Sequence, residues 1–586
     1  MKKLCVVDIE TDSFNVDDAK VKFVGILDLQ TNEYKIIQYE EPDEIQTILT
    51  SYDFVITFNG EQYDLPILRR HEIIVPMYKH IDLYKIYKKR APLLRSGGFK
   101  SYSLNNIAKT IGLEEEKGKI DYSIFKKNKW TEEELEEISR YLKQDLNITK
   151  KLWLFLIKKF DSLKEFISEK DVNEFKHITS SSGAYGYKVI CNLLGIREEY
   201  EDIPNPPKYK GGYVMPPKKE TIKGNILCFD FASLYPMMFI HSNLFSSKCE
   251  CCLKEDKWHG NDDFRIDGYY CSKHQGRIEE LIKEFYVNRK LYKLQKDSRQ
   301  FALKIILNTI YGISAKPSFK NIYNETTASD CTALARQCID FAIKRFEENM
   351  YNVVYTDTDS CFIELKPYQK RELCMRLAEE ISIKISRQFP FPFDEFNLKL
   401  DEGIKYLQFF IGRNGELNKK HYLYVNDDDK LTIKGLDIIQ KNCSELSLKI
   451  FENVLKSDII KNLDCKFDKE FIDNLINKTI KNDKTIIAKR FNIKPLKYYK
   501  SKTSIYYLIG EKYGDGEIFL IKNYRLGAGK GIKYCSVNEA KELEVEDLNL
   551  EDVYRELSPF IKDYVKEKEK EKKVGFEDIS MQMELW

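Results

Sequence analysis

The sequence has no long apolar run and no marked excess of either charge. Only four apolar residues, Leu4–Val7, precede the first acidic residue, a run too short for a signal peptide or a membrane span. We therefore expect an intracellular, cytoplasmic protein with no membrane partner. The 95 basic and 93 acidic residues leave a formal net charge of +2, so any surface that binds a polyanion must be local.

The sequence also lacks the dense cysteine pattern of a small disulfide-rich protein. Its 14 cysteines stand mostly singly in a chain of 586 residues, which fits reduced thiols in a cytosol. The length is too great for one hydrophobic core and predicts about three to five domains. With 42% apolar and 32% charged residues, the chain has the composition of a globular protein.

The first 160 residues have the pattern of an α/β domain. Four apolar segments within residues 1–68 alternate with turns and predict strands. Residues 131–160 begin with acidic and end with basic side chains, as suits the dipole of a long helix. We expect this domain to close near residue 155, and the Pro/Gly/Lys-rich segment 200–225 to be a connector.

The rest of the chain predicts a strand, a group of helices and a hairpin in turn. Residues 224–236 read as a buried strand that ends in a turn, and 277–348 as helices with a break at 311–317. The hairpin is expected over 353–365, followed by α/β structure to about 430. Beyond that point we expect a mainly helical, lysine-rich region. Within it, basic residues interleaved with aromatics are either a solvated face or a set of phosphate contacts.

The hairpin segment VVYTDTDSCFIEL carries Asp357 and Asp359 at its tip. Two like charges held that close raise each other's pKa unless a cation lies between them. Many acid pairs are simply solvated loop. A third acid, Asp230, is delivered to a turn by the strand in CFDFASLYP. Three carboxylates from separate strands suit two Mg²⁺ ions that act on a phosphoryl group.

Between these acids, the segment RQFALKIILNTIYGISAKP places Lys304, Asn308 and Tyr311 at i, i+4 and i+7. This spacing puts a cation, an amide and an aromatic ring on one helix face. Such a face could hold a triphosphate and stack on a base. An amphipathic helix with a lysine at its edge is the alternative.

These motifs, in this order, resemble the family B DNA polymerases. DFASLYP is similar to the first palm motif, KIILNTIYG to the fingers motif and YTDTDS to the second palm motif. The resemblance implies a right-hand polymerase in which Asp230 and Asp359 hold two Mg²⁺ ions and Asp357 lies beside them. It also implies nucleotide-binding residues, which would be Phe231, Ser233, Leu234, Tyr235, Arg289, Lys293, Lys304, Asn308 and Tyr311.

The N-terminal segment resembles the DEDD-type 3′–5′ exonucleases that proofread in this family. DIET, NGEQYDLPIL and YLKQD match the three motifs of those enzymes in order. The resemblance implies an RNase H-like fold and an active site with two Mg²⁺ ions, in which Tyr141 orients the attacking water. The four acids would be Asp8, Glu10, Asp64 and Asp145.

Further segments resemble DNA-contacting elements of the family. YKGGYV resembles the motif that joins exonuclease and palm, and KKHYLYV resembles the element that contacts the primer terminus. The implied DNA-binding residues are Asn59, Tyr209, Gly211, Gly212, Lys419, Lys420 and Tyr422. The chain departs from the family at Gln440, Lys441 and Asn442, where members often carry Arg-Arg-Asp.

The resemblance predicts a multidomain α/β and α+β protein. The expected order is a 3′–5′ exonuclease domain (1–155), a connector with the N-terminal palm region (156–225), palm with a zinc knuckle (226–276), fingers (277–318), palm (319–430), thumb (431–565) and a charged tether with a tail peptide (566–586).

A cysteine-rich segment follows the first palm motif. Cys249 and Cys252 form C-x2-C, and Cys271 and His274 form C-x2-H, which is the ligand spacing of a tetrahedral structural Zn²⁺ site. Cys251 and a histidine at 259 are spare ligands. Reduced thiols are one alternative. A disulfide, as in some relatives, is another.

The chain ends in SMQMELW behind a charged run. Gln582, Leu585 and Trp586 fit the Gln-x-x-Leu-aromatic pattern of peptides that bind a bacterial-type sliding clamp. An unstructured end or an anchor on the thumb would have the same sequence.

The sequence thus predicts a monomeric DNA polymerase with proofreading, whose partners are primer-template DNA and dNTPs. About 70 residues separate Asp230 from Lys304, too few for the large insertion of protein-primed phage polymerases, so we expect a nucleic-acid primer and a replicative role. The alternatives are a protein-primed or repair polymerase, a nucleic-acid-binding scaffold, or an exonuclease alone. Abundant Lys, Ile and Asn fit a virus or a low-GC host.

Overall fold

The computed structural model describes residues 2–564 except 14, 95–101, 114–119, 167–174, 202–207, 325, 394–395, 413–414, 440–442, 494–495, 497–498, 500, 503, 515, 525–533 and 563. The chain forms two compact units. The first comprises Met1–Tyr209, Tyr235–His259 and Asp267–Cys331, and the second comprises Lys210–Leu234, Gly260–Ile266 and Thr332–Trp586. No helix in the described ranges is long and apolar enough to cross a bilayer.

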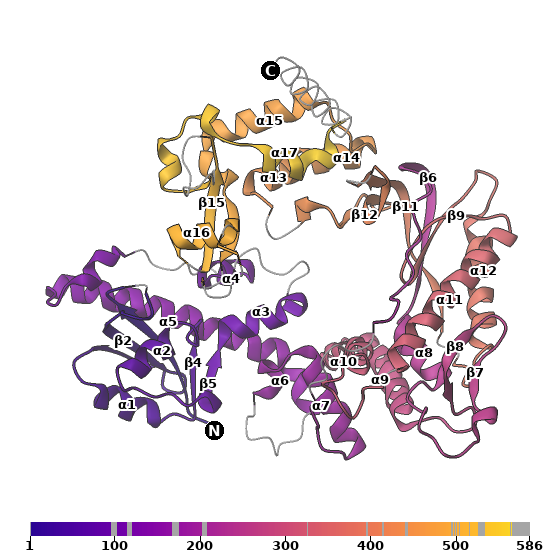
Figure 1. Ribbon diagram of the computed structural model, residues 1–586, viewed down its shortest axis with the longest axis horizontal. Coiled ribbons are helices and arrows are strands. Elements are labelled where there is room, and N and C mark those ends of the chain that lie inside the picture. The colour runs from indigo at the N-terminus through magenta and orange to yellow at the C-terminus, as the bar shows by residue number, and fades with distance from the viewer. Residues whose placement is uncertain are drawn as a thin grey trace, which may run out of the picture. The chain divides into compact units, whose positions relative to one another are not determined.

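The N-terminal part of the first unit is built on a five-stranded mixed sheet (Figure 1). β1 lies at its centre, antiparallel to β2 and parallel to β4. The four strands predicted within residues 1–68 are confirmed, and the sequence reading missed a fifth, three-residue strand. In sheet order the strands are β3 (Tyr34–Gln38), β2 (Val21–Asp28), β1 (Leu4–Thr11), β4 (Phe54–Thr57) and β5 (His80–Asp82).

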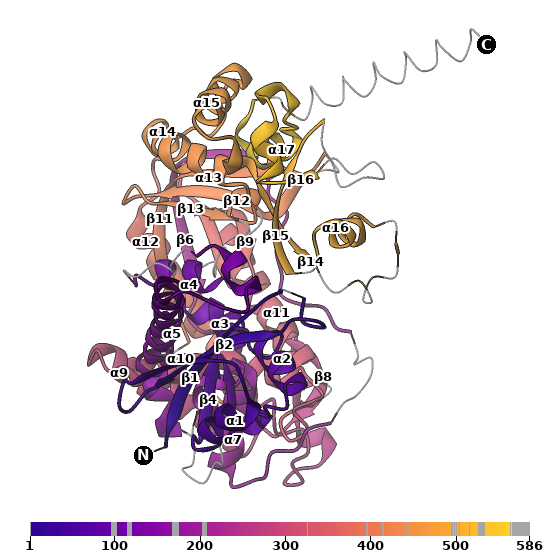
Figure 2. The same ribbon diagram turned by 90° about the vertical axis from the view of Figure 1, so that its left-hand side faces the viewer.

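Helices cover both faces of this sheet. The long helix α5 (Glu132–Phe160) packs on β1 and β2 and begins with a capping box between Thr131 and Glu134, so the predicted helix is confirmed (Figure 2). Phe23 and Leu142 pack between α5 and the sheet. The opposite face packs against α1 (Pro42–Thr50) and α2 (Asp64–Arg70).

The remainder of the first unit is mainly helical. α10 (Arg299–Ser314) packs against α7 (Ser182–Leu194) and α9 (Arg277–Leu294). The approach of α7 is close, since a Cβ atom at Gly186 would lie 2.3 Å from Thr309 Oγ1. The predicted helices with a break after α10 are confirmed. The other elements are α3 (Leu83–Leu94), α4 (Leu104–Thr110), α6 (Lys176–Thr179), α8 (Leu234–Ser242), β7 (Trp258–Gly260) and β8 (Arg265–Tyr270). The helix α11 (Thr327–Glu348) begins in this unit and belongs to the second unit from Thr332 onward.

The second unit contains a six-stranded antiparallel sheet with the order β13-β12-β11-β6-β10-β9. α12 (Arg371–Ser386) packs against β11, and α11 packs through Phe346 against Phe229 of β6. The predicted buried strand and hairpin are confirmed as β6 and as β9 with β10. The strands are β6 (Thr221–Phe231), β9 (Asn352–Asp357), β10 (Ser360–Glu364), β11 (Leu398–Ile411), β12 (Leu417–Asn426) and β13 (Leu431–Lys434).

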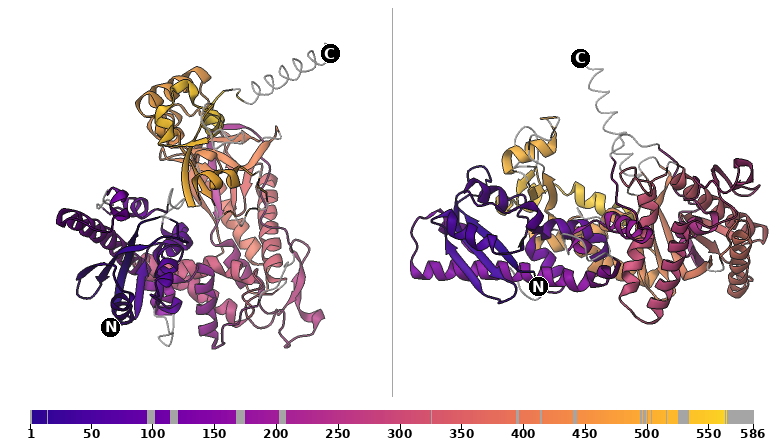
Figure 3. Two further views of the ribbon diagram at one scale, coloured as in Figure 1. Left: turned by 60° about the vertical axis from the view of Figure 1, so that its left-hand side comes forward. Right: turned by 90° about the horizontal axis from the view of Figure 1, so that it is seen from below.

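Most of the regular structure described in the C-terminal region is helical, as expected. The region also contains a three-stranded sheet that the sequence did not predict, formed by β14 (Lys489–Ile493), β15 (Gly516–Lys522) and β16 (Tyr534–Ser536) (Figure 3). Basic and aromatic residues such as those of β14 masked the alternation expected of strands. The helices are α13 (Glu445–Ile450), α14 (Lys456–Asn462), α15 (Lys469–Asn482), α16 (Ile505–Tyr513) and α17 (Glu551–Leu557).

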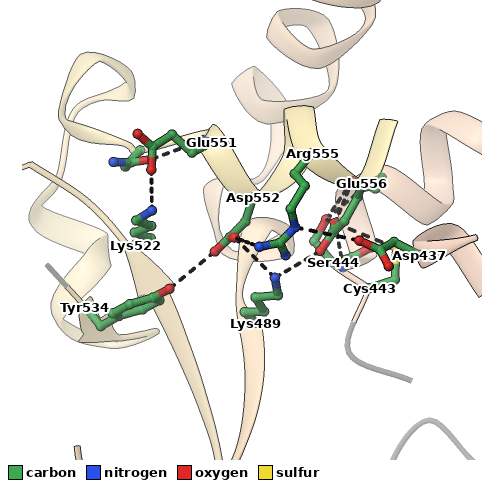
Figure 4. Close-up of polar contacts among 12 residues, drawn as sticks. Asp437, Cys443, Ser444, Lys489, Lys522, Tyr534, Glu551, Asp552, Arg555 and Glu556 are labelled. Atoms are coloured by element: carbon green, nitrogen blue, oxygen red, sulfur yellow. Dashed lines mark hydrogen bonds and ion pairs between the residues drawn. The ribbon is translucent and has the colours of Figure 1, made fainter. Parts of the chain in front are cut away.

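A buried polar network ties this region together (Figure 4). Glu556 of α17 is 1% exposed and accepts hydrogen bonds from the Ser444 backbone N–H and hydroxyl, at 3.0 and 2.7 Å. Lys489 of β14 lies 3.4 Å from Glu556 and 3.3 Å from Asp552. Because Ser444 caps α13, the network joins that helix to α17 and to the small sheet.

Candidate active sites

Three carboxylates converge in the first unit. Asp8 and Glu10 alternate on β1 and therefore share a face, while Asp145 comes from α5. One oxygen of each lies within 4.8 Å of the others. They line a cavity of about 370 Å³ together with Asn59, Asp64 and other residues. Hard oxygen donors at this separation fit divalent cations such as Mg²⁺.

Asp64, the fourth predicted acid, lines the same cavity from the start of α2. It is 4% exposed, and burial raises its pKa, with a further contribution from the charge of Asp82. Asp82 was not predicted from the sequence. It accepts hydrogen bonds from the backbone N–H groups of Asn59 and Glu61, at 3.0 and 3.1 Å, and so shapes the loop that follows β4.

Two residues beside these acids have unusual surroundings. Asn59 has a φ of 66°, in the left-handed region that is uncommon outside glycine, and its buried Oδ1 accepts no hydrogen bond from the described residues. The hydroxyl of Tyr141 lies 2.9 Å from the hydroxyl of Tyr122, a residue that lines the cavity and that the sequence did not predict. Both observations suit a site that holds a further ligand.

In the second unit, strand pairing brings Asp230 and Asp359 together. Asp230 pairs with Ser360, and the Phe231 N–H donates to the Asp359 carbonyl at 2.9 Å. Burial, with the charges of Asp359 and Asp401, raises the pKa of Asp230 to about 7. Burial also raises the pKa of Asp359. A bound cation would offset both the burial and the mutual repulsion of these carboxylates.

Asp357 has different partners from Asp359. Lys420 Nζ lies 2.9 Å from its Oδ1, and the hydroxyl of Tyr422 donates to its Oδ2 at 3.2 Å. Lys420 Nζ also donates to the hydroxyl of Thr358 at 3.1 Å. Thr358 and Lys420 have φ values of 66° and 60°. The hairpin tip and Lys420 and Tyr422 of the KKHYLYV segment therefore form one polar cluster.

The sequence reading missed Asp401, a third acid whose charge acts on Asp230. β11 pairs with β6 opposite Asp230, and its register shifts between Leu400 and Glu402. This bulge places Asp401 as an extra residue on the strand. The available signal was the acid pair in LKLDEG, which lies outside the matched motifs.

The helix face predicted on α10 is present. Lys304 and Asn308 are exposed, with buried residues between them. Arg289 and Lys293 lie on α9, which packs against α10. The Nε of Arg289 is buried and makes no hydrogen bond with the described residues. Lys304, Arg289 and Lys293 therefore supply positive charge on two packed helices, and Arg289 Nε is not paired with an acid among the described residues.

Three tyrosines from separate motifs meet in the first unit. The ring of Tyr235 stacks on that of Tyr311, with centroids 4.7 Å apart and planes at 29°. The hydroxyl of Tyr311 lies 3.0 Å from that of Tyr209. No local sequence pattern predicts this contact, because Tyr209 and Tyr311 lie about 100 positions apart.

The remaining predicted residues are placed as follows. Arg336 donates to the Gly211 carbonyl at 2.8 Å, and a side chain at Gly211 would meet open space. Gly212 and Lys419 are exposed, Ser233 has a φ of 59°, and Phe231, Leu234 and Tyr422 are buried. The departures at 440–442 and the tail residues Gln582, Leu585 and Trp586 lie outside the described residues.

The cysteine-rich segment brings together a set that differs from the predicted one. The sulfurs of Cys249, Cys251 and Cys271 all lie within 4.8 Å of one another. Cys252 and His274 are described but do not belong to this group. Cys251, which the sequence predicts only as a spare ligand, therefore belongs to the group in place of Cys252.

Comparison with known proteins identifies two families that the chain matches. Residues 148–512 match the model of DNA polymerase family B, and residues 5–157 match the RNase H superfamily. A DNA polymerase of Pyrococcus glycovorans is 25% identical over 80% of this chain and 62% of its own length. DNA polymerase 1 of Saccharolobus solfataricus is 26% identical over 75% of this chain and 52% of its own length.

The chain thus spans about half to two thirds of the length of these relatives. A solved structure of the family B DNA polymerase from Pyrobaculum calidifontis has the same fold, with a TM-score of 0.59 and 16% identity over 96% of this chain and 78% of that one. An RNase H-like domain followed by a polymerase-type sheet defines the class of protein. The chain belongs to DNA polymerase family B.

Proposed function

We propose that this chain is a template-directed DNA polymerase that adds deoxynucleotides to a primer 3′ end and proofreads with its 3′–5′ exonuclease domain. The observation that carries the proposal is the pairing of β6 with β10, which sets Asp230 beside Asp359 in a sheet of the family B fold. The first unit supplies a separate set of acids for excision.

In the polymerase site, Asp230 and Asp359 would hold two Mg²⁺ ions. When bound, such ions stabilise the charge on the attacking and leaving oxygens of phosphoryl transfer. Carboxylates on adjacent strands hold their positions because the backbone between them is hydrogen-bonded. Asp357, already paired with Lys420, would position that lysine instead of binding a metal.

The nucleotide and DNA contacts follow from exposed positive charge and aromatic stacking. Lys304, Arg289 and Lys293 would neutralise the triphosphate, with Asn308 beside them on α10. Tyr235, stacked on Tyr311, would limit the space at the sugar. The open surface at Gly211 and Gly212 would lie along the template, and Lys419 and Lys420 would contact the primer.

In the exonuclease site, Asp8, Glu10, Asp64 and Asp145 would hold Mg²⁺ in the 370 Å³ cavity. Tyr141 would orient the attacking water through its hydroxyl, and Asn59 would contact the DNA strand. The proposal is supported by one cavity that the four acids and Asn59 line, and by the contact of Tyr141 with Tyr122, which lines the same cavity.

The proposed function also includes the substrates, a structural metal and a protein partner. Primer-template DNA and dNTPs are the substrates of a monomeric, replicative enzyme inside the cell. The cysteine-rich segment would hold a structural Zn²⁺ ion. The tail residues Gln582, Leu585 and Trp586 bind a sliding clamp, so deleting them should lower processivity only when the clamp is present.

Primer extension with one dNTP at a time tests the proposal. The purified protein should add only the nucleotide complementary to the template base, and only with a divalent cation. Asp230→Asn should lose this activity. Glu364→Gln, a change at the other end of β10, is the matched control and should retain it. Incorporation that ignores the template, or that survives Asp230→Asn, would overturn the assignment.

A further inference from the structure

The cysteines of this chain are distributed unevenly. Ten of the 14 are buried, whereas Cys249, Cys252 and Cys443 are partly exposed and Cys251 is exposed. A buried cysteine packs as a small apolar side chain, but thiols gathered at a surface need another explanation. Within one segment of 23 residues, the structure brings three sulfurs together.

The three sulfurs are close but not bonded. Cys249 Sγ lies 2.8 Å from Cys251 Sγ, which lies 3.1 Å from Cys271 Sγ. A disulfide bond would be about 2.05 Å long. All 14 cysteines are free thiols, and three sulfurs in one cluster cannot all be satisfied by a single disulfide.

The residues around Cys271 are fixed by buried hydrogen bonds. Cys271 directly follows β8, and its N–H donates to the Ser246 hydroxyl at 2.9 Å. The side-chain amide of Asn243 donates to the carbonyls of Cys271 and His274, at 2.8 and 2.9 Å. Asn243 is fully buried, so it holds this turn in place from the protein interior.

The turn that carries Cys249 is joined to the same scaffold. The Cys249 N–H donates to the Ser246 carbonyl at 3.0 Å. Lys257 Nζ donates to the carbonyls of Ser247 and Cys249, at 3.3 and 2.5 Å. One residue, Ser246, therefore contacts both cysteine turns and sets the distance between them.

Backbone amides also point at the sulfurs. The Cys251 N–H donates to Cys249 Sγ at 3.4 Å, and the His274 N–H donates to Cys271 Sγ at 3.3 Å. N–H donors favour sulfur that carries negative charge, as a metal-bound thiolate does.

We propose that Cys249, Cys251 and Cys271 bind one zinc ion as thiolates. This inference makes specific the zinc ion of the proposed function and does not depend on polymerase activity. Thiolate sulfur is a ligand that zinc prefers, and three thiolates would fill three of the four positions of a tetrahedral site. Cys252 is not a ligand, although its spacing from Cys249 alone would favour it.

A zinc ion bound here would crosslink the segment between α8 and α9. α9 carries Arg289 and Lys293, so the loop fixes the start of the helix that supplies these charges. Because a structural metal contributes to folding free energy, removing the zinc should lower the thermal stability of the chain.

Metal analysis of protein purified without added metal is the first test. The wild type should contain about one zinc per chain. Cys251→Ser should fall below about half an equivalent, while the matched variant Cys252→Ser should keep its zinc. Retention in Cys251→Ser with loss in Cys252→Ser would overturn the ligand assignment.

Two measurements on the wild type apply even if a cysteine variant does not fold. Replacing zinc with Co²⁺ should produce thiolate-to-cobalt charge-transfer absorption, and a chelator should expose three more thiols to a thiol reagent. Primer extension by the same preparation separates the two proposals. A protein that extends primers but holds less than about half an equivalent of zinc would overturn the zinc site alone.

Discussion

The ammonium group of Lys420 lies 2.9 Å from Oδ1 of Asp357. The hairpin tip therefore carries two aspartates with different surroundings. Asp357 is paired with a lysine and with the Tyr422 hydroxyl, whereas Asp359 lies beside Asp230. These different surroundings support the proposal that Asp357 positions a cationic side chain while Asp359 holds metal.

This division predicts unequal effects of neutralising the two acids. Asp357→Asn should lower dNTP incorporation about 10- to 100-fold, the usual cost of losing a group that orients others. Asp359→Asn should lower it to background. Single-turnover incorporation at saturating Mg²⁺ measures both.

A double-mutant cycle supplies the control. Lys420→Met should cost about as much as Asp357→Asn, and the double variant little more, because both changes break one contact. Equal losses in Asp357→Asn and Asp359→Asn, with a raised Mg²⁺ requirement in both, would contradict the assignment.

The contact of Tyr141 with Tyr122, which lines the exonuclease cavity, predicts a graded effect on excision. Tyr122→Phe removes the hydroxyl that lies 2.9 Å from the Tyr141 hydroxyl and should slow excision of a mismatched primer about tenfold. Tyr141→Phe should slow it further, because it removes the hydroxyl that we propose orients the attacking water. Primer extension should be unchanged in both. An unaltered excision rate in Tyr122→Phe would remove that residue from the site.

Features of the fold and of the polymerase site that depend on neighbouring residues could be predicted from the sequence, whereas contacts between residues far apart in the sequence could not. The strand that delivers Asp230 and the hairpin with Asp359 are local patterns of apolar residues, so the sequence predicted both. Asp401 depends on the register of β11 against β6 and on a bulge, which no local pattern encodes. The contact of Tyr209 with Tyr311 joins residues about 100 positions apart.

The cysteine-rich segment shows the same limit. Spacing favoured Cys252 because C-x2-C is the common knuckle. Ser246 and Asn243 instead hold the turns so that Cys251 meets Cys271. In the C-terminal region, β14 (KRFNI) and the three-residue β16 carry no clear alternation of apolar and polar residues, so local sequence does not predict the small sheet.

Glu279 predicts a pH-dependent stability. It is fully buried at the start of α9 and accepts from the Phe245 N–H at 2.7 Å; burial raises its pKa from 4.5 to about 7. The folded state therefore holds a proton that the unfolded state loses above about pH 4.5. Stability falls as the pH rises from that value to about 7.

Glu279→Gln should remove this dependence. Relative to wild type, the variant should gain about 3 kcal/mol of unfolding free energy between pH 4.5 and 8, the equivalent of the pKa shift. Thermal-unfolding midpoints of both proteins across that pH range measure it. A constant difference between the two at all pH values would contradict the prediction.

The C-terminal network predicts a large cost for removing one lysine. Lys489→Met leaves the buried Glu556 without its cation, while Asp552 keeps Arg555, and breaking a buried pair by removing one partner costs about 3–5 kcal/mol. Lys522→Met is the matched control, because its partner Glu551 is 60% exposed and such pairs are worth at most about 1 kcal/mol. Equal unfolding midpoints for the two variants would show that the network does not stabilise this region.

The central claim is that one chain carries two separate acidic sites, one for synthesis and one for excision. The most direct measurement follows a labelled primer with a mismatched 3′ end, with and without dNTPs, in Asp359→Asn and Asp8→Asn. The first variant should excise but not extend, and the second should extend a matched primer but not excise. Loss of both activities in either variant, with its fold intact, would contradict the account.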